Sequence, residues 1–257
     1  MTADLARALY DNLRVAGTAF ADLAPDGATR RFGSVHVATA GVAVPDLNVV
    51  LVTDQPDAGN LEDAVAWMAA RELPFQVVAT DRTRDAVEAL DTEPALEAVG
   101  SQPGMARPSL DGLDRGGADL EVAAVADGAG LDAFIAVFTA VFGTPRDVVE
   151  PLAPDALPAG EALSAFVGRV DGEAVACGQY VLHDGVVGLY SIGVREPYRR
   201  RGFGAAMTRT LLRHGREAGG RIGVLESTAM AVSLYESLGF ERVATLHHFA
   251  PVGQDKA

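Results

Sequence analysis

The residues best suited to chemistry lie in one short stretch, from Ser191 to Met207. The stretch reads Ser-Ile-Gly-Val-Arg-Glu-Pro-Tyr-Arg-Arg-Arg-Gly-Phe-Gly-Ala-Ala-Met, so a strand pattern leads through an arginine-rich loop into a helix. Free N–H groups at a helix start, with the positive end of the helix dipole, bind anions. Gly202 and Gly204 carry no Cβ that would block the approach, and Arg199–Arg201 add positive charge. The pattern predicts a pyrophosphate site, and the alternative is a strand–helix turn with incidental glycines.

Two common phosphate-binding motifs do not fit this loop. A P-loop requires the sequence Gly-Lys-Ser/Thr, and the only lysine of the chain is Lys256. The dinucleotide fingerprint G-x-G-x-x-G would need glycine where Met207 stands. The loop therefore matches neither of these phosphate-binding motifs.

The charge of the chain supports a small polyanionic ligand. The formal net charge is −14, from 21 basic and 35 acidic residues, which argues against non-specific binding to nucleic acid or anionic membranes. The segment from Arg195 to Arg221 is the exception, since eight arginines and two glutamates give it +6. The alternative for such a charge run is a solvated helix face.

Other classes of protein are excluded by composition. No apolar run approaches the ~18 residues of a membrane span, and the N-terminus reads as an amphipathic helix rather than a signal peptide. Cys177 is the only cysteine, so an internal disulfide or a multi-cysteine metal site is impossible. On its strand it is expected to be a small core residue. We expect a cytoplasmic protein with no metal, no nucleic-acid partner and no membrane partner.

Helix and strand patterns alternate along the chain, which predicts an α/β fold with a mixed sheet. A stretch rich in Gly, Pro and Asp, Gln102–Gly117, is expected to be a linker between domains at 1–110 and 118–257. The first half is expected to contain helices at 2–16, at Leu61–Arg71 and from Thr92 or Pro94 to Val99. Its strands are expected at Gly33–Ala40, Leu47–Thr53 and Phe75–Thr80. The second half is expected to contain helices at Leu131–Phe142, Gly204–Ala218 and Met230–Leu238 and strands at Leu120–Ala126, Ala162–Val170, Glu173–His183, Val186–Val194, Ile222–Glu226 and Glu241–Phe249.

The two halves look like a diverged repeat. Each half is expected to run from a strand through a helix and a short strand to a second helix that ends at glycine. Aligning Ala95–Gly100 with Leu234–Gly239 places Leu96 opposite Tyr235.

Two motifs in the second half resemble those of the GNAT acetyltransferases, which transfer an acetyl group from acetyl-CoA to an amine. The first motif is a strand ending in Val, then Pro and Arg-x-x-Gly-x-Gly, and it matches Val194, Pro197, Arg199, Gly202 and Gly204. The second is Ala-x-x-Leu-Tyr-x-x-Leu-Gly-Phe, which matches Ala231 to Phe240 without a gap. The resemblance covers the chain from about Leu120 onward. It implies two tandem GNAT-like domains, of which the first is degenerate because it carries neither motif.

The resemblance also implies how acetyl-CoA is held. The strand backbone at Ile192, Gly193 and Val194 should pair with the pantetheine arm. Many members carry asparagine three residues before the Ala of the second motif, and Thr228 stands there in this chain. The loop and helix start should hold the pyrophosphate, through the residues Arg199, Arg200, Arg201, Gly202, Phe203, Gly204 and Ala205.

The same resemblance gives Tyr235 the role of protonating the departing CoA thiolate, because a phenol keeps its proton at neutral pH. The alternative for Tyr235 is a core aromatic. Members with a side-chain base often place glutamate on the strand before the loop, but that strand, residues 188–192, has no carboxylate here. Glu226, at the end of the next strand, is the nearest acid and the candidate base. A water relay, or an amine that binds already neutral, remains open, and His183 and Asp184 are expected to lie on an exposed hairpin turn.

The leading hypothesis is an acetyl-CoA-dependent N-acetyltransferase that works by direct transfer in a ternary complex. The acceptor would be an amine of a small molecule or peptide, and the protein would be a monomer or homodimer. The rival is a non-catalytic acyl-CoA-binding or regulatory module.

Overall fold

The computed structural model describes residues 2–113, 118–150 and 163–254. It divides into two compact units, neither of which is a continuous piece of sequence. The C-terminal unit consists of Met1–Ala16 and Met105–Val243, and the N-terminal unit consists of Gly17–Gly104 and Ala244–Ala257. Across these described ranges, no helix is long and apolar enough to cross a lipid bilayer.

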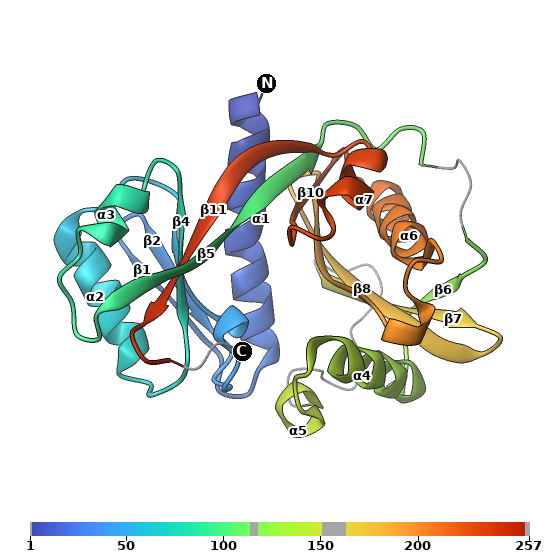
Figure 1. Ribbon diagram of the computed structural model, residues 1–257, viewed down its shortest axis with the longest axis horizontal. Helices are drawn as coiled ribbons and strands as arrows, with labels where there is room; N and C mark the ends of the chain where they lie inside the picture. Colours follow the sequence, from blue (N-terminus) through green and yellow to red (C-terminus); the bar gives the residue numbers. More distant parts are fainter. Residues whose placement is uncertain (1, 114–117, 151–162, 255–257) are drawn as a thin grey trace. The chain divides into compact units, whose positions relative to one another are not determined.

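The N-terminal unit contains an antiparallel meander that continues into a parallel strand (Figure 1). Its strands follow the order β1-β2-β3-β4-β11. Helix α2 connects β3 to the parallel strand β4, and apolar side chains from both layers form the core. The elements are β1 (Ala28–Phe32), β2 (Val35–Thr39), η1 (Pro45–Leu47), β3 (Asn48–Val52), α2 (Ala58–Ala69), β4 (Gln76–Thr80) and α3 (Arg84–Glu88).

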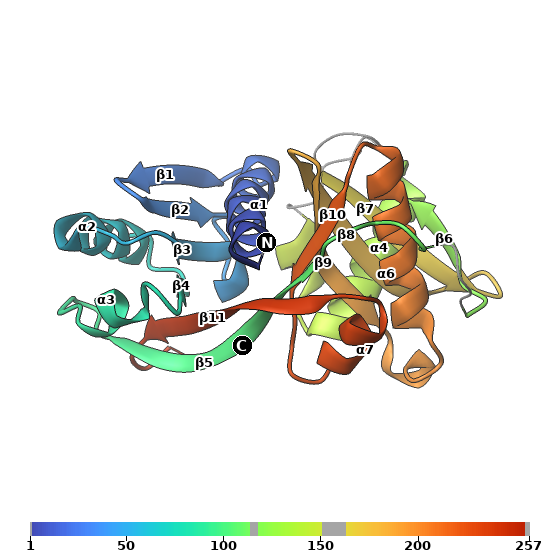
Figure 2. The same cartoon turned by 90° about the horizontal axis from the view of Figure 1, so that it is seen from above.

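The C-terminal unit repeats this plan with longer strands. The strands β6 to β9 form an antiparallel meander, and α6 then connects β9 to the parallel strand β10. Figure 2 shows α6 lying against β8 and β9. The elements are β6 (Glu121–Ala124), α4 (Gly128–Phe142), α5 (Arg146–Val149), β7 (Leu163–Val170), β8 (Glu173–His183), β9 (Val186–Val194), η3 (Glu196–Tyr198), α6 (Phe203–Glu217), β10 (Ile222–Glu226) and α7 (Val232–Ser237).

Three elements contribute residues to both units: α1 (Thr2–Leu23), β5 (Leu96–Arg107) and β11 (Glu241–Pro251). The last strand of each half pairs with the sheet of the other half. β11 is antiparallel to β4, with Phe249 opposite Val77, and β5 lies beside β10. The order of elements in the two halves is therefore a repeat whose final strands are exchanged.

The predicted helix at Thr92–Val99 is wrong, because Leu96–Arg107 is strand β5. Strand pairing with its neighbours overrides the helical preference of Ala, Leu and Glu in this segment. The predicted linker Gln102–Gly117 is also wrong in its first part, since it contains the end of β5 and then the buried side chains of Leu110 and Leu113. Residues 114–117 lie outside the described part of the chain.

The repeat alignment changes with this correction. The counterpart of α7 is α3, so Leu96 does not stand opposite Tyr235. The fourth residue of α3 is Val87, which is buried, and the fourth residue of α7 is Tyr235.

Candidate active site

Strand β9 contains a bulge just before the loop. Cys177 pairs with Gly193 and Gln179 with Tyr190, so Ser191 and Ile192 together lie opposite Gly178. Ser191 has φ of 52°, the left-handed conformation of a bulge residue. Bulges strengthen the local twist and redirect a strand, and they occur near active sites.

Beyond the bulge, β9 separates from β10. The parallel pairing runs from Val186–Ile222 to Leu189–Leu225, although β9 itself continues to Val194. The register of these two strands ends at Leu189–Leu225, and residues 191–194 continue β9 beyond it. The strands thus open at the place where the sequence predicts that Ile192, Gly193 and Val194 bind an amide-containing arm.

The start of α6 presents amides without partners in the helix. The first intrahelical hydrogen bond is donated by Ala206 N to Gly202 O, at 3.0 Å. The N–H groups of Phe203, Gly204 and Ala205 precede it, and the N-cap Gly202 supplies no side chain to accept from them. Gly202 has φ of 82°, which favours glycine, and Arg200 adopts the same region at 61°. Such a left-handed arginine is a strained backbone state found at functional sites.

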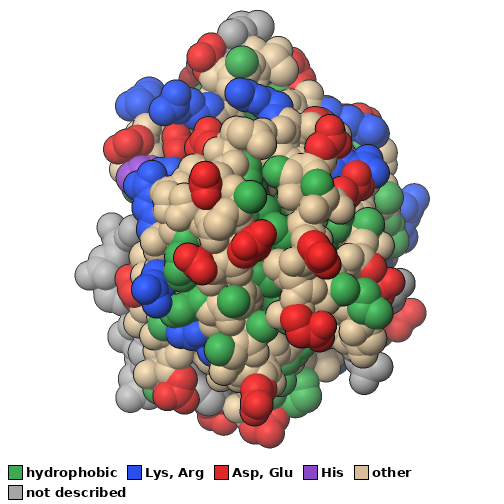
Figure 3. All heavy atoms as spheres, turned by 90° about the vertical axis from the view of Figure 1, so that its left-hand side faces the viewer, with side chains coloured by type: hydrophobic (Ala, Val, Ile, Leu, Met, Phe, Trp, Pro, Cys, Tyr) green, Lys and Arg blue, Asp and Glu red, His purple; other side chains and the backbone are tan. Residues whose placement is uncertain are grey.

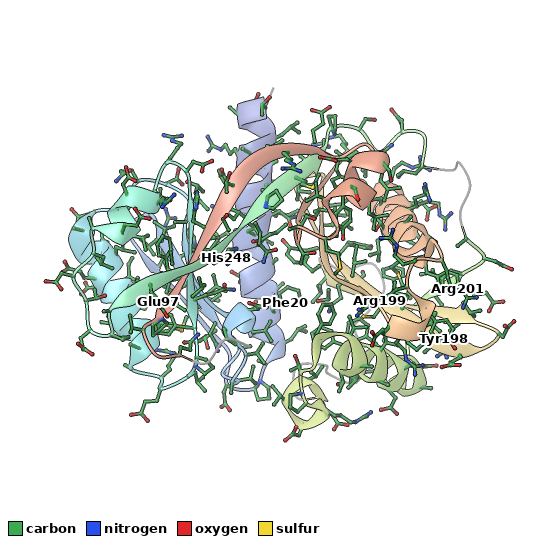
Figure 4. All side chains as sticks on the ribbon, viewed as in Figure 1. Phe20, Glu97, Tyr198, Arg199, Arg201 and His248 are labelled. Carbon is green, nitrogen blue, oxygen red and sulfur yellow. The ribbon has the colours of Figure 1, made fainter. Side chains whose placement is uncertain are left out.

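Side chains around the loop hold it in place (Figure 4). Glu173 on β8 accepts hydrogen bonds from Arg195 and from the hydroxyl of Tyr198, the latter at 2.7 Å. The hydrogen bond from Tyr198, and then that from Arg195, lowers the pKa of Glu173. Arg199 Nε donates to Val194 O at 3.0 Å, and the Arg201 guanidinium lies 5.5 Å from the Tyr198 ring. Arg199 and Arg201 are therefore held against the loop that leads into α6.

Tyr235 lies on the α6 side of the sheet, in the core with Met207 and Leu211. Its side chain is 8% exposed and meets Phe240 edge-on at 5.7 Å between ring centroids. Burial raises the pKa of Tyr235 to about 12. Helix α7 also borders the loop, because a Cβ on Gly204 would meet Leu234 at 3.4 Å.

Glu226 is half-buried at the end of β10 and lies on the other face of the sheet. Gly223 faces Leu212 of α6, and Glu226, three residues later, points to the opposite side. The candidate acid and base thus belong to opposite faces beside the opening of β9 and β10. Thr228 is exposed in the following loop, where its carbonyl accepts from Ala231 N at 3.0 Å.

His183, Asp184 and Cys177 lie where the sequence predicts them, the first two at an exposed turn and Cys177 in the core. His183 and Asp184 lie at the β8–β9 turn and form an exposed pair at 3.5 Å. Cys177 is fully buried, and desolvation raises the pKa of its thiol to about 12. Within the described ranges, no three His, Cys, Asp or Glu side chains come together in a way that could hold a metal ion.

Several residues of the site could not be found from the sequence motifs. Arg107, at the end of β5, donates to the carbonyls of Leu238 and Asp111 and so anchors the end of α7. Asn12 on α1 accepts a hydrogen bond from Tyr190 on β9. The contacts of Arg107 with Leu238 and of Asn12 with Tyr190 join positions more than a hundred residues apart, so no local spacing reveals them.

Residues 135–240 match the model of the acetyltransferase (GNAT) family. No curated protein matches the sequence.

Solved structures share the fold over nearly the whole chain. A GCN5-related N-acetyltransferase from Kribbella flavida is 21% identical with a TM-score of 0.70, and the match covers 99% of this chain and 96% of that one. A conserved protein of unknown function from Staphylococcus epidermidis is 15% identical with a TM-score of 0.61, over 90% of this chain and 96% of that one. A GCN5-related N-acetyltransferase-like protein from Streptococcus suis is 13% identical with a TM-score of 0.56, and the match covers 94% of this chain and 99% of that one. Residues 135–240 are therefore similar to the GNAT family, and the chain as a whole shares the fold of these solved structures.

Proposed function

We propose that the protein is an N-acetyltransferase that moves the acetyl group of acetyl-CoA to an amine of a small molecule or peptide. The observation that carries the proposal is the start of α6, where three amides precede the first helical hydrogen bond and arginines lie around them. An uncapped helix start of this kind binds phosphate groups. The site belongs to the part of the chain from residue 118 onward, and α1 and β5 complete its unit.

The residues present fit acetyl-CoA. The amides from Arg200 to Ala205 would hold the pyrophosphate, with the guanidinium groups of Arg199–Arg201 beside it. The free edge of β9 at residues 192–194 would pair with the amides of the pantetheine arm and direct the thioester into the opening. Thr228 would add a hydroxyl at the far side of this opening.

Each proton of the reaction has a candidate residue. Glu226 would take a proton from the acceptor ammonium, and the amine nitrogen would then attack the thioester carbonyl carbon. The carbon–sulfur bond breaks, and Tyr235 would give its proton to the CoA thiolate. The acylated nitrogen would then lose its second proton, which would restore the phenol of Tyr235, and Glu226 would release the first proton to solvent. Because the pKa of Tyr235 is raised to about 12, its proton is present at neutral pH. The products are the acetylated amine and free CoA.

Binding is tested by thermal unfolding with acetyl-CoA. At an acetyl-CoA concentration about 100 times Kd, binding at one site raises the free energy of unfolding by ~2.7 kcal/mol. For a chain of this size, this raises the melting temperature by about 5 °C or more. Gly204→Val should abolish this shift, because a branched side chain at the second position of α6 crowds the amides and Leu234. Gly59→Val is the matched control, since Gly59 is the second residue of α2. A shift that survives Gly204→Val would contradict the pyrophosphate placement.

Catalysis is tested with a panel of amines: spermidine, tyramine and a lysine-containing peptide, with free thiol as the readout. Acetylation of a panel amine by wild type, and its loss in Tyr235→Phe, would support the enzyme. Acetyl-CoA binding with no acetylation of any amine would favour a non-catalytic acyl-CoA-binding module instead.

A further inference from the structure

The N-terminal unit carries two arginines on neighbouring elements that the proposed acetyl transfer does not use. Arg30 is exposed on β1, and Arg71 follows the end of α2 and is half-buried. Helix α2 lies against β1 and β2 (Figure 2). The two side chains therefore belong to one layer of this unit, in a chain whose net charge is −14.

Each of these arginines lies over an aromatic ring. The guanidinium carbon of Arg30 is 4.8 Å from the centre of the Phe32 ring. That of Arg71 is 3.1 Å from the centre of the Trp67 ring. Arg30 and Phe32 are two residues apart on a strand and therefore share a face, and both rings pack against the core between α2 and the sheet. The rings thus hold the two guanidinium groups on the α2 side of the sheet.

No carboxylate offsets these two charges within the described part of the chain. None of the ion pairs there includes Arg30 or Arg71. Burial, and then the charge of Arg30, lowers the pKa of Arg71, and no acidic residue opposes this effect. Arg107 differs, because the charge of Arg209 also lowers its pKa but that of Asp111 raises it. The pair of Arg30 and Arg71 is therefore a site of positive charge without a counterion.

We propose that Arg30 and Arg71 form a binding site for the phosphate group of a small molecule, on the N-terminal unit and separate from the acetyl-CoA site. A guanidinium can donate two parallel hydrogen bonds to a phosphate. Two guanidinium groups match the charge of about −1.5 to −2 that a phosphate group carries at neutral pH, whereas a carboxylate would neutralise only one of them. Arg71 also donates to Trp67 O at the end of α2, which fixes Arg71 while the exposed Arg30 closes on the ligand.

The carboxylate that caps the first turn of α2 does not reach this pair. Asp57 is the N-cap of a helix of 12 residues, and Arg71 follows the C-cap Ala70. A helix of that length spans about 18 Å, so the two ends of α2 are electrostatically distinct. The inference requires neither acetyl-CoA nor Tyr235 and is independent of the proposed acetyltransferase function.

The test uses the fluorescence of Trp67, which is the only tryptophan of the chain and lies under Arg71. Inorganic phosphate and glycerol phosphate are titrated separately at constant ionic strength, with acetate and chloride as reference anions. We expect a saturable change in emission with at least one of the two phosphates and none with acetate or chloride. A response to both would show that a free phosphate is sufficient, and a response to glycerol phosphate alone would show that the site takes a phosphate ester.

Arg31→Gln is the matched control for Arg30→Gln. Both arginines lie on β1, but Arg31 points to the opposite face and donates to Gly33 O at 2.7 Å. Arg30→Gln should raise the half-saturating phosphate concentration at least about tenfold, while Arg31→Gln should change it less than about twofold. The thermal shift produced by acetyl-CoA should be the same in both variants, because α6 belongs to the other unit.

Three results would overturn the inference. The first is that neither phosphate changes the emission of the wild-type chain. The second is that acetate or chloride produces the same change, which would assign it to screening or to a carboxylate. The third is that Arg30→Gln and Arg31→Gln weaken the response equally. A phosphate response together with an absent acetyl-CoA shift would contradict the proposed function and leave this site standing.

Discussion

At the scale of single residues, Tyr235 is a candidate proton donor with a firmly packed side chain that keeps its proton at neutral pH. Its side chain is held by Phe240 and the α6 core, and burial keeps its pKa near 12. Tyr235→Phe removes only the hydroxyl and keeps the ring contacts. We expect the single-turnover rate to fall by about 10² while the affinity for acetyl-CoA stays within about twofold. Calorimetric binding and stopped-flow acetylation measure the two quantities, and an unchanged rate would remove Tyr235 from the mechanism.

Cys177 illustrates the opposite case, a reactive residue type made inert by its surroundings. The thiolate is the reactive species, and desolvation raises the pKa of this thiol to about 12. We expect almost no reaction of the native protein with a disulfide reagent at pH 8, and one thiol after unfolding. Rapid labelling of the folded protein would contradict the burial. An inert thiol would agree with direct transfer, because it leaves no cysteine to carry the acetyl group.

At the scale of elements, the two crossover helices differ at their first turn. In α2, the Asp57 carboxylate accepts from Gly59 N at 3.0 Å and from Asn60 N at 3.4 Å. In α6 the N-cap is Gly202, which has no such group. The first amides of α2 are thus hydrogen-bonded by the N-cap side chain of that helix, whereas no N-cap side chain accepts from the first amides of α6, which could bind an anion.

Asp57→Ala tests this difference. Loss of an N-cap carboxylate should lower the free energy of unfolding by about 0.5–2 kcal/mol. The thermal shift produced by acetyl-CoA should not change, because the proposed site is at α6. Urea unfolding with and without acetyl-CoA gives both values, and a reduced ligand effect would implicate α2 in binding.

Local signals in the sequence predicted the hairpins and α6 well. The turns at Asp171-Gly172 and Asp184-Gly185 have positive φ at both residues, as Asp-Gly pairs favour. The strand at Ile222–Glu226 has the predicted bounds, and α6 differs by one residue at each end. In these segments the local pattern and the tertiary structure agree.

Non-local contacts account for what the sequence did not reveal. Strand β5 was predicted as a helix and a linker, because its neighbours in the sheet are far away in sequence. The bulge at Ser191 carries no local signal, since serine there has an ordinary strand context. Asn12 meets Tyr190 across 178 positions, so only the folded chain shows that α1 contacts β9 there.

At the scale of the whole molecule, the exchanged strands make each half depend on the other. Met105, Leu110 and Leu113 precede residue 118 and yet belong to the core of the C-terminal unit. Residues 1–16 belong to that unit as well. Residues 1–16 and 105–113 of the first half are therefore part of the C-terminal unit.

The last prediction is that one chain binds one acetyl-CoA. The first half has the same crossover plan, but Asp57 already occupies the amides at the start of α2, and a pyrophosphate would meet its negative charge. Carboxylates are also spread over the side of the molecule that carries α2 and α3, as Figure 3 shows. Val87 stands where the second half has Tyr235, so the proton donor is missing too. Isothermal titration should give a stoichiometry of about one, and Gly204→Val should remove the binding isotherm entirely. Two sites of similar affinity, or a full isotherm in Gly204→Val, would show that the first half holds acetyl-CoA despite its capped helix.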